Sequence, residues 1–311
     1  MIVLNVARPA GAADPVELAG AALAAGLDGV ALADSPRLFP DCLVETERVL
    51  SATPARLAGP CVLSLGLRHP AAVAGAVRTL DAHHPGRLLT VVGRGESSVR
   101  NEGLAPPSLR AYEASLRTLR ELVPASALLL GAASGPRTIA ATAARLGGVL
   151  IDAGADPAVV GKAVALARSA RPDVPVWMFV RAVVTDDDAA ADAAAAPVLG
   201  SCAARLVQAP DWFDVPAALR TGVAAVADAH DYRRHGTAEA RTGRDVPAGA
   251  DRFVRDRFVV TGERQAVAER FAAFGAVGVD GVVLAGALDG VLDRLDDLGR
   301  AVREGLTKDG R

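Results

Sequence analysis

Short apolar runs alternate with longer segments of helical periodicity along most of this chain. Because the runs are apolar at successive positions, each predicts a strand buried on both faces, which is typical of a parallel sheet covered by helices. Eight such runs predict a closed (β/α)8 TIM barrel, an α/β fold, rather than an open sheet. The predicted strands span residues 1–6, 29–34, 61–67, 87–93, 127–132, 148–152, 174–180 and 281–285.

Helical patterns fill most of the intervals, at residues 15–26, 41–52, 70–83, 108–122, 137–146 and 156–169. Pro15, Pro70 and Pro157 stand at first helical positions, where the missing N–H is not needed. Gly26 and Gly147 stand where helices end on a left-handed residue. Strand and helix are therefore expected to alternate over most of the chain.

One region interrupts this alternation. Residues 185–257 contain an acidic run, an Ala-rich stretch, a helical pattern near 215–230 and a segment rich in Gly, Pro, Asp and Arg. Insertions of this length are usually binding loops or lids. We expect a single barrel domain over 1–311, with 185–257 as a lid or mobile insertion between the seventh and eighth strands. A small second domain is the alternative.

Composition and charge limit the kinds of binding partner and the cellular compartment that we expect for this protein. The chain has 311 residues, 51% of them hydrophobic but only 4% aromatic, and a formal charge of -2, which gives no reason to expect nucleic acid or an anionic membrane. The three cysteines, Cys42, Cys61 and Cys202, are too far apart to predict a metal site or a disulfide framework. No signal peptide and no spanning segment are predicted, so we expect a cytoplasmic protein with reduced thiols.

Polar or small residues follow several of the apolar runs. In a parallel barrel these positions lie at the C-terminal ends of the strands, where active-site residues are found. Asp34-Ser35-Pro36 follows the second run, and Arg68-His69-Pro70 follows the third. Gly-Arg-Gly-Glu-Ser-Ser at 93–98 follows the fourth, and Ser134-Gly135-Pro136 follows the fifth. The order of these motifs resembles that of the luciferase-like flavin and deazaflavin oxidoreductases. Within them it is most similar to the F420-dependent branch that includes methylenetetrahydromethanopterin reductase.

The resemblance implies a barrel that holds coenzyme F420, or alternatively FMN, in its mouth. It places Asp34 and Glu96 near the reactive face of the ring and the 134–135 turn near the phosphate. It also implies a bulge with a non-prolyl cis peptide at the end of the third strand, near Ser64 and Leu65. The cofactor-binding residues expected from it are Ser35, Ser64, Leu65, Gly93, Arg94, Gly95, Ser134, Gly135 and Arg137.

A carboxyl group beside such a ring has a clear chemical use. Hydride transfer must be matched by proton transfer, and a partly buried carboxyl with a raised pKa suits that work. Glu96 is the first candidate, because Gly93 and Gly95 let the backbone approach a flat cofactor, and Asp34 is the second. The residues alone also allow Glu96 to be a surface carboxylate in a turn and Asp34 to be a helix cap.

The turn at Ser134 and Gly135 precedes a helix, whose N–H groups can bind a phosphate with Arg137 adding charge. A plain turn with Ser134 as the N-cap explains the same residues nearly as well. The glycines at 93–95 also resemble a dinucleotide fingerprint, but the third glycine is missing and no helix is expected to follow at once.

Three functions remain open. The first is an F420-dependent oxidoreductase that transfers a hydride between the deazaflavin and a small organic substrate, with a carboxyl group as proton donor. The second is an FMN-dependent monooxygenase on the same scaffold. The third is a barrel that has lost cofactor turnover, because the chain from Ser64 to Leu67 runs directly into Arg68 and shortens the expected bulge. A homodimer is expected.

Overall fold

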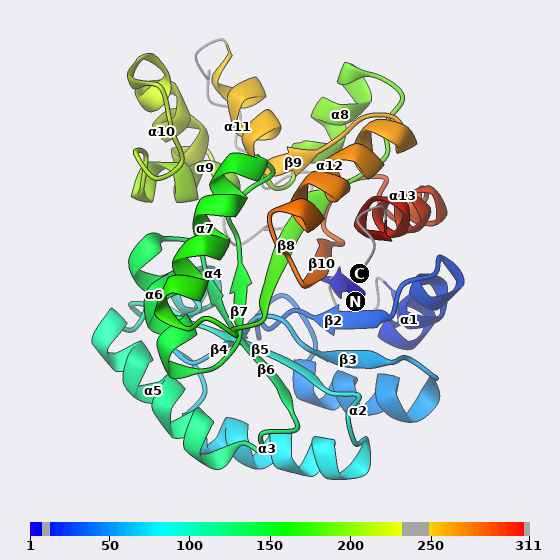
Figure 1. Ribbon diagram of the computed structural model, residues 1–311, viewed down its shortest axis with the longest axis vertical. Coiled ribbons are helices and arrows are strands. Elements are labelled where there is room, and N and C mark those ends of the chain that lie inside the picture. The colour runs from blue at the N-terminus through cyan, green and yellow to red at the C-terminus, as the bar shows by residue number, and fades with distance from the viewer. Residues whose placement is uncertain (8–12, 232–248, 308–311) are drawn as a thin grey trace. The chain divides into compact units, whose positions relative to one another are not determined.

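The computed structural model describes residues 1–7, 13–231 and 249–307 (Figure 1). The chain divides into two compact units. Unit 1 comprises Met1–Asp152, Ala165–Met178 and Asp280–Val283, and unit 2 comprises Ala153–Val164, Phe179–Val279 and Leu284–Arg311. The single domain expected over 1–311 stays a prediction.

The strands form a nearly closed parallel sheet, so the predicted TIM barrel is confirmed. The strands follow the order β3-β2-β1-β10-β8-β7-β6-β5-β4, and the short strand β9 pairs with β8 outside this path. Their residues are almost all buried, as the continuous apolar runs require. The strands on the path are β1 (Ile2–Val6), β2 (Gly29–Leu32), β3 (Leu57–Pro60), β4 (Leu63–Ser64), β5 (Leu89–Gly93), β6 (Leu128–Ala133), β7 (Val149–Ile151), β8 (Val176–Ala182) and β10 (Gly281–Ala285).

The third barrel strand differs from its prediction. The sequence placed it at 61–67, but β3 ends at Pro60 and the short β4 follows after a break. Gly59 is needed here because a Cβ on it would lie 1.7 Å from the carbonyl oxygen of Leu89. A parallel bridge joins Ala58 of β3 to Leu88, the residue directly before β5. Gly59 and Pro60 interrupt the apolar pattern, which is why the strand was predicted too late in the chain.

Apart from α4, which the sequence did not predict, the helices of unit 1 begin within one residue of their predicted starts. The side chains of Asp14, Asp41, His69 and Ser108 accept backbone N–H groups at four of these starts. In Figure 1, α2, α3 and α5 lie on the outer side of the strands. The bounds are α1 (Pro15–Ala24), α2 (Cys42–Ala52), α3 (Pro70–His83), α4 (Glu96–Asn101), α5 (Leu109–Leu122) and α6 (Pro136–Arg145), while α7 (Pro157–Ala170) runs through both units.

Unit 2 is mainly helical in its described parts. β9 (Val259–Val260) pairs in parallel with the end of β8, through Arg181 and Ala182. The helical pattern predicted near 215–230 is confirmed. The remaining elements are α8 (Asp188–Ala195), α9 (Leu199–Gln208), η1 (Ala217–Leu219), α10 (Arg220–Asp228), α11 (Ala250–Phe258), α12 (Arg264–Ala276) and α13 (Leu295–Thr307).

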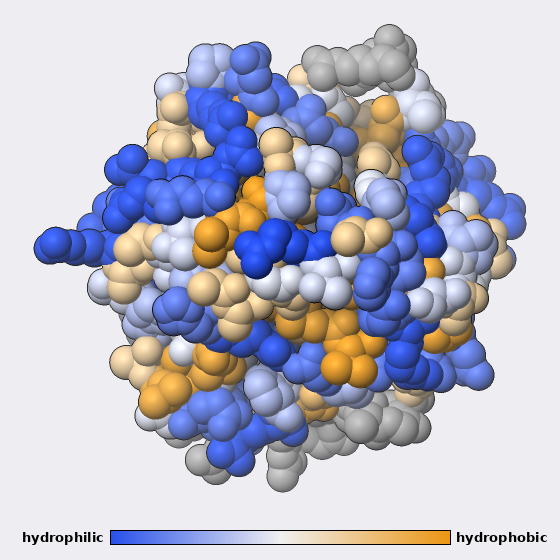
Figure 2. Space-filling view, turned by 90° about the horizontal axis from the view of Figure 1, so that it is seen from below, coloured by the Kyte–Doolittle hydropathy of each residue, from blue (hydrophilic) through white to orange (hydrophobic). Residues whose placement is uncertain are grey.

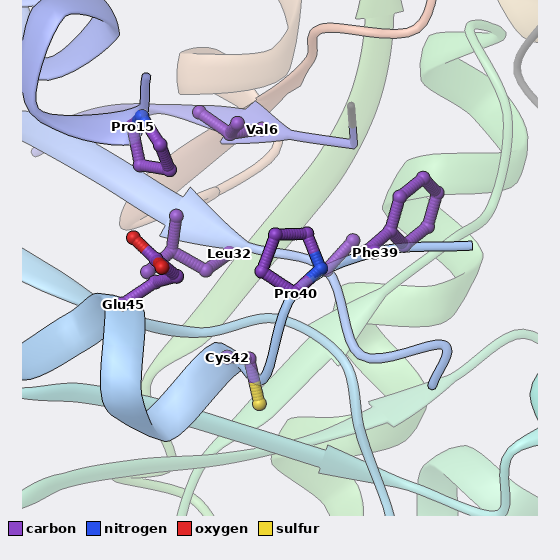
Figure 3. Close-up of a pocket in the computed structure, with 8 residues that line it drawn as sticks. Val6, Pro15, Leu32, Phe39, Pro40, Cys42 and Glu45 are labelled. Atoms are coloured by element: carbon purple, nitrogen blue, oxygen red, sulfur yellow. The ribbon is translucent and has the colours of Figure 1, made fainter. Parts of the chain in front are cut away.

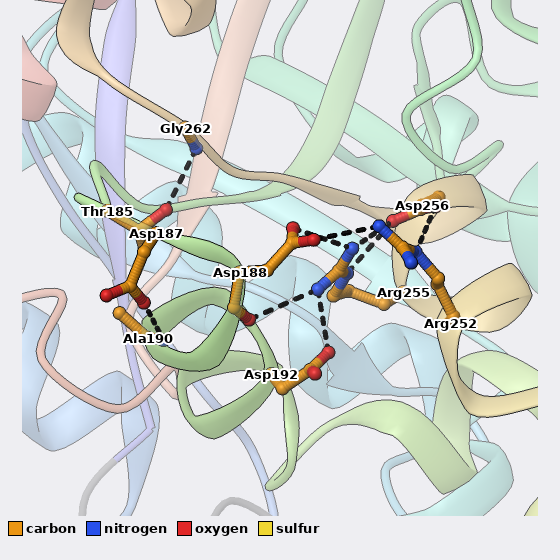
Figure 4. Close-up of polar contacts among 9 residues, drawn as sticks. All are labelled: Thr185, Asp187, Asp188, Ala190, Asp192, Arg252, Arg255, Asp256 and Gly262. Carbon is orange, nitrogen blue, oxygen red and sulfur yellow. Dashed lines mark hydrogen bonds and ion pairs between the residues drawn. The ribbon is translucent and has the colours of Figure 1, made fainter.

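An arginine joins the two ends of the predicted insertion (Figure 4). Arg255 on α11 is buried, and its guanidinium contacts Asp192 at 2.7 Å, Asp188 at 3.3 Å and Asp256 at 2.9 Å. Because Asp188 and Asp192 belong to α8, the contacts fasten α11 to α8. The lid role of 185–257 stays a prediction, and its residues 232–248 lie outside the described part of the chain.

The surface mixes charged and apolar residues, with several separate apolar areas on the face in Figure 2. The large exposed apolar side chains include Val44 on α2 and Leu122 on α5. Among the described helices none can cross a membrane by itself, and the bent pair α8 and α9 meets the length and composition requirement only as a pair. The homodimer stays a prediction.

Candidate active site

Asp34 follows β2 and is held by an arginine and a backbone amide. Its side chain is only 2% exposed. Nη2 of Arg68 donates to Oδ1 at 3.0 Å, and the N–H of Ser64 donates to Oδ2 at 3.1 Å. The alternative of a helix cap is wrong, because Asp41 caps α2 instead. Asp34 is therefore a buried carboxylate whose partners fix the position of β4.

Arg68 is the residue that sequence reasoning left without a role. Its Nη2 also donates to Asp41 Oδ2 at 2.8 Å, so one guanidinium joins two carboxylates. Burial opposes the positive charge, but the hydrogen bonds to Asp34 and Asp41 outweigh it and raise the pKa of Arg68. The signal in the sequence was the need of a buried Asp34 for a cationic partner. The neighbouring His69 caps α3 by accepting the N–H of Ala71.

The expected bulge lies between β3 and β4. The non-prolyl cis peptide joins Cys61 to Val62, which corrects its predicted place near Ser64 and Leu65. The amide of Asn5 on β1 donates to the Cys61 carbonyl at 2.7 Å and to the Ala31 carbonyl at 3.3 Å. Shortening of the following loop has thus not removed the bulge, and Asn5, which the sequence did not single out, supports it.

Two glycines of the 93–98 motif allow a close approach to this bulge. A Cβ on Gly93 would lie 2.6 Å from Cγ1 of Val62. Gly95 has a φ of 79°, and a Cβ there would lie 1.8 Å from Oγ of Ser64. Arg94 turns away from the two glycines, because its Nε donates to the carbonyl of Pro107 at 2.9 Å. The side chains of Val62 and Ser64 therefore pack directly against the glycine backbone at the end of β5.

Glu96 does not have the environment that its prediction assumed. The helix α4 begins at Glu96, so the expectation that no helix follows the glycines is wrong. The Glu96 side chain is 43% exposed and accepts from Nη2 of Arg100, one turn later, at 2.7 Å. This is the geometry of a solvated ion pair within a helix. The predicted role of Glu96 as the proton donor stays untested.

The predicted phosphate turn lies at the end of β6, which is next to β5 in the sheet. Gly135, not Ser134, is the N-cap of α6, and no side chain caps this helix start. A Cβ on Gly135 would meet no heavy atom within 4 Å. The first N–H groups of α6, with Arg137 in the first turn, can therefore donate hydrogen bonds to an anion.

Ser35 and Leu65 complete the predicted set. Both are buried. The carbonyl of Ser35 accepts the N–H groups of Leu38 and Phe39, and the N–H of Leu65 donates to the carbonyl of Gly93 at 2.9 Å. They shape the loops after β2 and β4 in this structure. No described contact joins them to the turn at 134–137.

A small pocket lies between the first turns of α1 and α2 and the outer side of β1 and β2 (Figure 3). It is lined by Leu32, Phe39, Cys42 and other residues, and its volume is about 20 Å³. That is enough for about one water molecule. This pocket is too small for a deazaflavin or flavin ring.

Comparisons with known proteins agree with the fold. Residues 4–131 match the family model described as luciferase-like monooxygenase. The structure of an F420-dependent tetrahydromethanopterin reductase from Methanopyrus kandleri is similar at a TM-score of 0.71 and 15% identity, over 99% of both chains. An F420-dependent secondary alcohol dehydrogenase in complex with an F420–acetone adduct has a TM-score of 0.67 at 17% identity, over 97% of this chain and 99% of its own. A monooxygenase from Streptomyces bottropensis has a TM-score of 0.63 at 16% identity, over 100% and 99%. A search of curated proteins finds no match.

Proposed function

We propose that this chain is a luciferase-like oxidoreductase that uses coenzyme F420 to exchange a hydride with a small organic substrate. The match to the family model over residues 4–131 and the barrel fold support this proposal and agree with the resemblance inferred from the motifs. The choice of F420 over FMN and the hydride reaction belong to the proposal. The homodimer and the cytoplasmic location belong to it as well.

One relationship within unit 1 supports the cofactor proposal. The glycines at the end of β5 and the uncapped start of α6 lie after neighbouring strands, since Val92 of β5 pairs with Gly131 of β6. The glycines let the chain at Val62 and Ser64 pack close to the end of β5, and the uncapped helix start can bind a phosphate. Their occurrence side by side at the C-terminal ends of two adjacent strands fits a cofactor with a ring at one end and a phosphate further along.

The residues that would hold such a cofactor can be named from this geometry. Gly93 and Gly95 let Val62 and Ser64 pack against the end of β5, so they shape the region where the resemblance places the ring. The N–H groups at the start of α6, together with Arg137, would bind the phosphate. When bound, F420 supplies a ring carbon that accepts or donates a hydride. The protein must then position the substrate and move one proton.

The chain's carboxyls differ in fitness for that proton. Asp34 is buried and accepts hydrogen bonds from Arg68 and from the N–H of Ser64. The Glu96 side chain is 43% exposed and accepts a hydrogen bond from Arg100.

The FMN-dependent monooxygenase is the second candidate, because the matching family model and several similar structures are described as monooxygenases, an EDTA monooxygenase among them. The test is a fluorescence titration of the purified full chain with F420 and, separately, with FMN. Tight binding of F420 and weak binding of FMN support the proposal. A preference for FMN moves the protein to the monooxygenase side, and binding of neither supports a barrel without cofactor turnover.

A further inference from the structure

Gly131 lies on β6 at a point where α5 and α6 both pack closely on the strand. A Cβ on Gly131 would lie 2.3 Å from Cγ2 of Thr142 on α6 and 3.2 Å from Oη of Tyr112 on α5. Carbon atoms in contact lie about 3.5–4.0 Å apart, so only glycine leaves room for Thr142 at this position. The helix α6 therefore rests directly on the backbone of β6 at Gly131.

The side chains around Gly131 have little freedom to move aside. Thr142 and Tyr112 are both fully buried. Thr142 is branched at Cβ, so its Cγ2 stays close to the backbone of α6 and has few rotamers. The hydroxyl of Tyr112 donates to the carbonyl of Val92 on β5 at 3.4 Å. A larger residue in place of Gly131 would consequently displace α6 rather than a single side chain.

This contact lies behind the two neighbouring strand ends of the candidate site. Val92 pairs with Gly131 in the sheet and directly precedes Gly93 at the end of β5. Thr142 belongs to α6, whose uncapped start at Pro136 follows β6. The two positions are six residues apart, about 9 Å along a helix. Because a helix moves as a rigid element, the seating of α6 on Gly131 determines where its first N–H groups lie relative to β5.

We propose that Gly131 is a positioning residue for the cofactor, because it sets the spacing between the end of β5 and the phosphate-binding start of α6. The inference rests on the proposed F420-dependent function. A ligand that binds at two points gains affinity from the link between them only where the spacing of the two points matches the ligand. Gly131 should therefore govern binding of the whole cofactor and leave the binding of either end by itself nearly unchanged.

Gly131→Ala tests the spacing. The purified full chain is titrated with three probes, which are F420, the same deazaflavin with its ribityl chain but no phosphate, and inorganic phosphate. We expect the affinity for F420 to fall by at least roughly tenfold, because the displaced α6 no longer matches the ligand. The affinities for the phosphate-free deazaflavin and for inorganic phosphate should each change by less than roughly twofold.

Thr142→Ser tests whether the effect passes through α6. Serine lacks Cγ2 but keeps the hydroxyl, so α6 can return to its place in the double variant that combines it with Gly131→Ala. The next neighbours of the added Cβ, Oη of Tyr112 at 3.2 Å and Cδ2 of Leu146 at 3.3 Å, then need to move only slightly. We expect the double variant to recover the F420 affinity of the wild type to within roughly threefold.

Two controls separate positioning from loss of stability. Gly75→Ala on α3 adds the same methyl group where a Cβ would meet nothing within 4 Å. Leu298→Ala removes a fully buried side chain of α13 and lowers the free energy of unfolding by opening a cavity. Urea unfolding measures the stability of every variant. Both controls should keep the F420 affinity of the wild type at temperatures where they are folded.

The outcomes distinguish this inference from the proposed function. If the wild type does not bind F420, the proposed function fails. If the wild type binds F420 and Gly131→Ala binds it equally well, the assignment of Gly131 fails and the function survives. An equal loss for F420 and for the phosphate-free deazaflavin, a loss in Leu298→Ala, or a double variant without recovery also overturns the assignment. If Gly131→Ala does not fold, Thr142→Leu decides, because its longer side chain pushes α6 away from an unaltered β6 and should produce the same pattern of three affinities.

Discussion

Arg68 contacts both carboxylate oxygens of Asp34, with Nη2 at 3.0 Å from Oδ1 and Nε at 3.4 Å from Oδ2. The two residues come from the ends of successive barrel strands. Because Oδ2 also accepts the N–H of Ser64, the pair ties the loop after β2 to the start of the loop after β4. The bulge and the glycine edge of the candidate site depend on this arrangement.

Replacing Arg68 by Met should destabilise the protein strongly. It leaves the buried Asp34 without its cation, and removal of one partner of a buried pair costs about 3–5 kcal/mol, less here because Arg68 is partly exposed. Asp41→Asn is the matched control, since it removes the more exposed ion pair between Arg68 and Asp41 while Asn remains a good N-cap. Urea unfolding measures the free energy of unfolding of both variants. An equal loss of unfolding free energy in the two variants would show that the buried pair of Arg68 and Asp34 stabilises the protein no more than the exposed pair of Arg68 and Asp41.

The ion pair between Arg68 and Asp41 should also affect how the stability of the protein depends on pH in the acid range. Burial raises the pKa of Asp41, but the hydrogen bonds from Arg68 and from the N–H groups of Val44 and Leu43 outweigh it, and the pKa is lowered. A carboxyl with a lowered folded pKa stabilises the fold above its unfolded pKa of about 3.9 and loses this effect as the pH falls through the folded value. Unfolding free energies measured from pH 6 to pH 2.5 should therefore fall more steeply for the wild type than for Asp41→Asn. Parallel curves would contradict this.

Local signals predicted most of the fold. The helix expected over 70–83 is observed as Pro70–His83, because a proline and a capping His69 mark its start within a few residues of sequence. The Arg68–Asp34 pair was not predictable in this way, since it joins residues of two different loops. The hydrogen bond from the Asn5 amide to the Cys61 carbonyl was hidden for the same reason, because it joins residues 56 positions apart.

Gly95→Ala should disturb the candidate site more than a glycine substitution normally does. The new Cβ needs a left-handed φ and would also collide with Oγ of Ser64. Gly103 has a φ of 74° with nothing within 4 Å of a Cβ, so Gly103→Ala isolates the backbone effect, about 1–2 kcal/mol. Urea unfolding and F420 titration should show a larger loss of both stability and affinity for Gly95→Ala. Identical behaviour of the two variants would mean that Ser64 moves away without consequence.

Glu96→Gln tests the carboxyl that the sequence predicts as the proton donor. The change breaks the pair with Arg100, which is worth about 0.2–0.5 kcal/mol in a helix. We expect turnover to fall no further than in Arg100→Gln, because the Glu96 side chain is exposed. Arg100→Gln breaks the same pair from the other side and is the control. If Glu96→Gln abolishes turnover while Arg100→Gln does not, the proton-transfer role returns to Glu96.

Gly135→Leu should weaken cofactor binding without weakening the fold. Gly135 has an ordinary extended backbone, with φ at -97°, and its Cβ would point into open space, so the protein itself tolerates a side chain there. A bulky group would instead obstruct the N–H groups at the start of α6. We expect unfolding free energy to change by less than about 0.5 kcal/mol.

The phosphate itself can be tested by pairing ligands with this variant. F420 should bind Gly135→Leu at least roughly tenfold more weakly, a loss of about 1.4 kcal/mol. The same deazaflavin with its ribityl chain but no phosphate should bind equally well to both proteins. Arg137→Gln, which removes charge but not space, should cause a smaller loss that shrinks as salt is raised. Full affinity of Gly135→Leu for F420, or equal losses for both ligands, would place the phosphate elsewhere, because only a ligand group seated on the first turn of α6 is sensitive to that side chain.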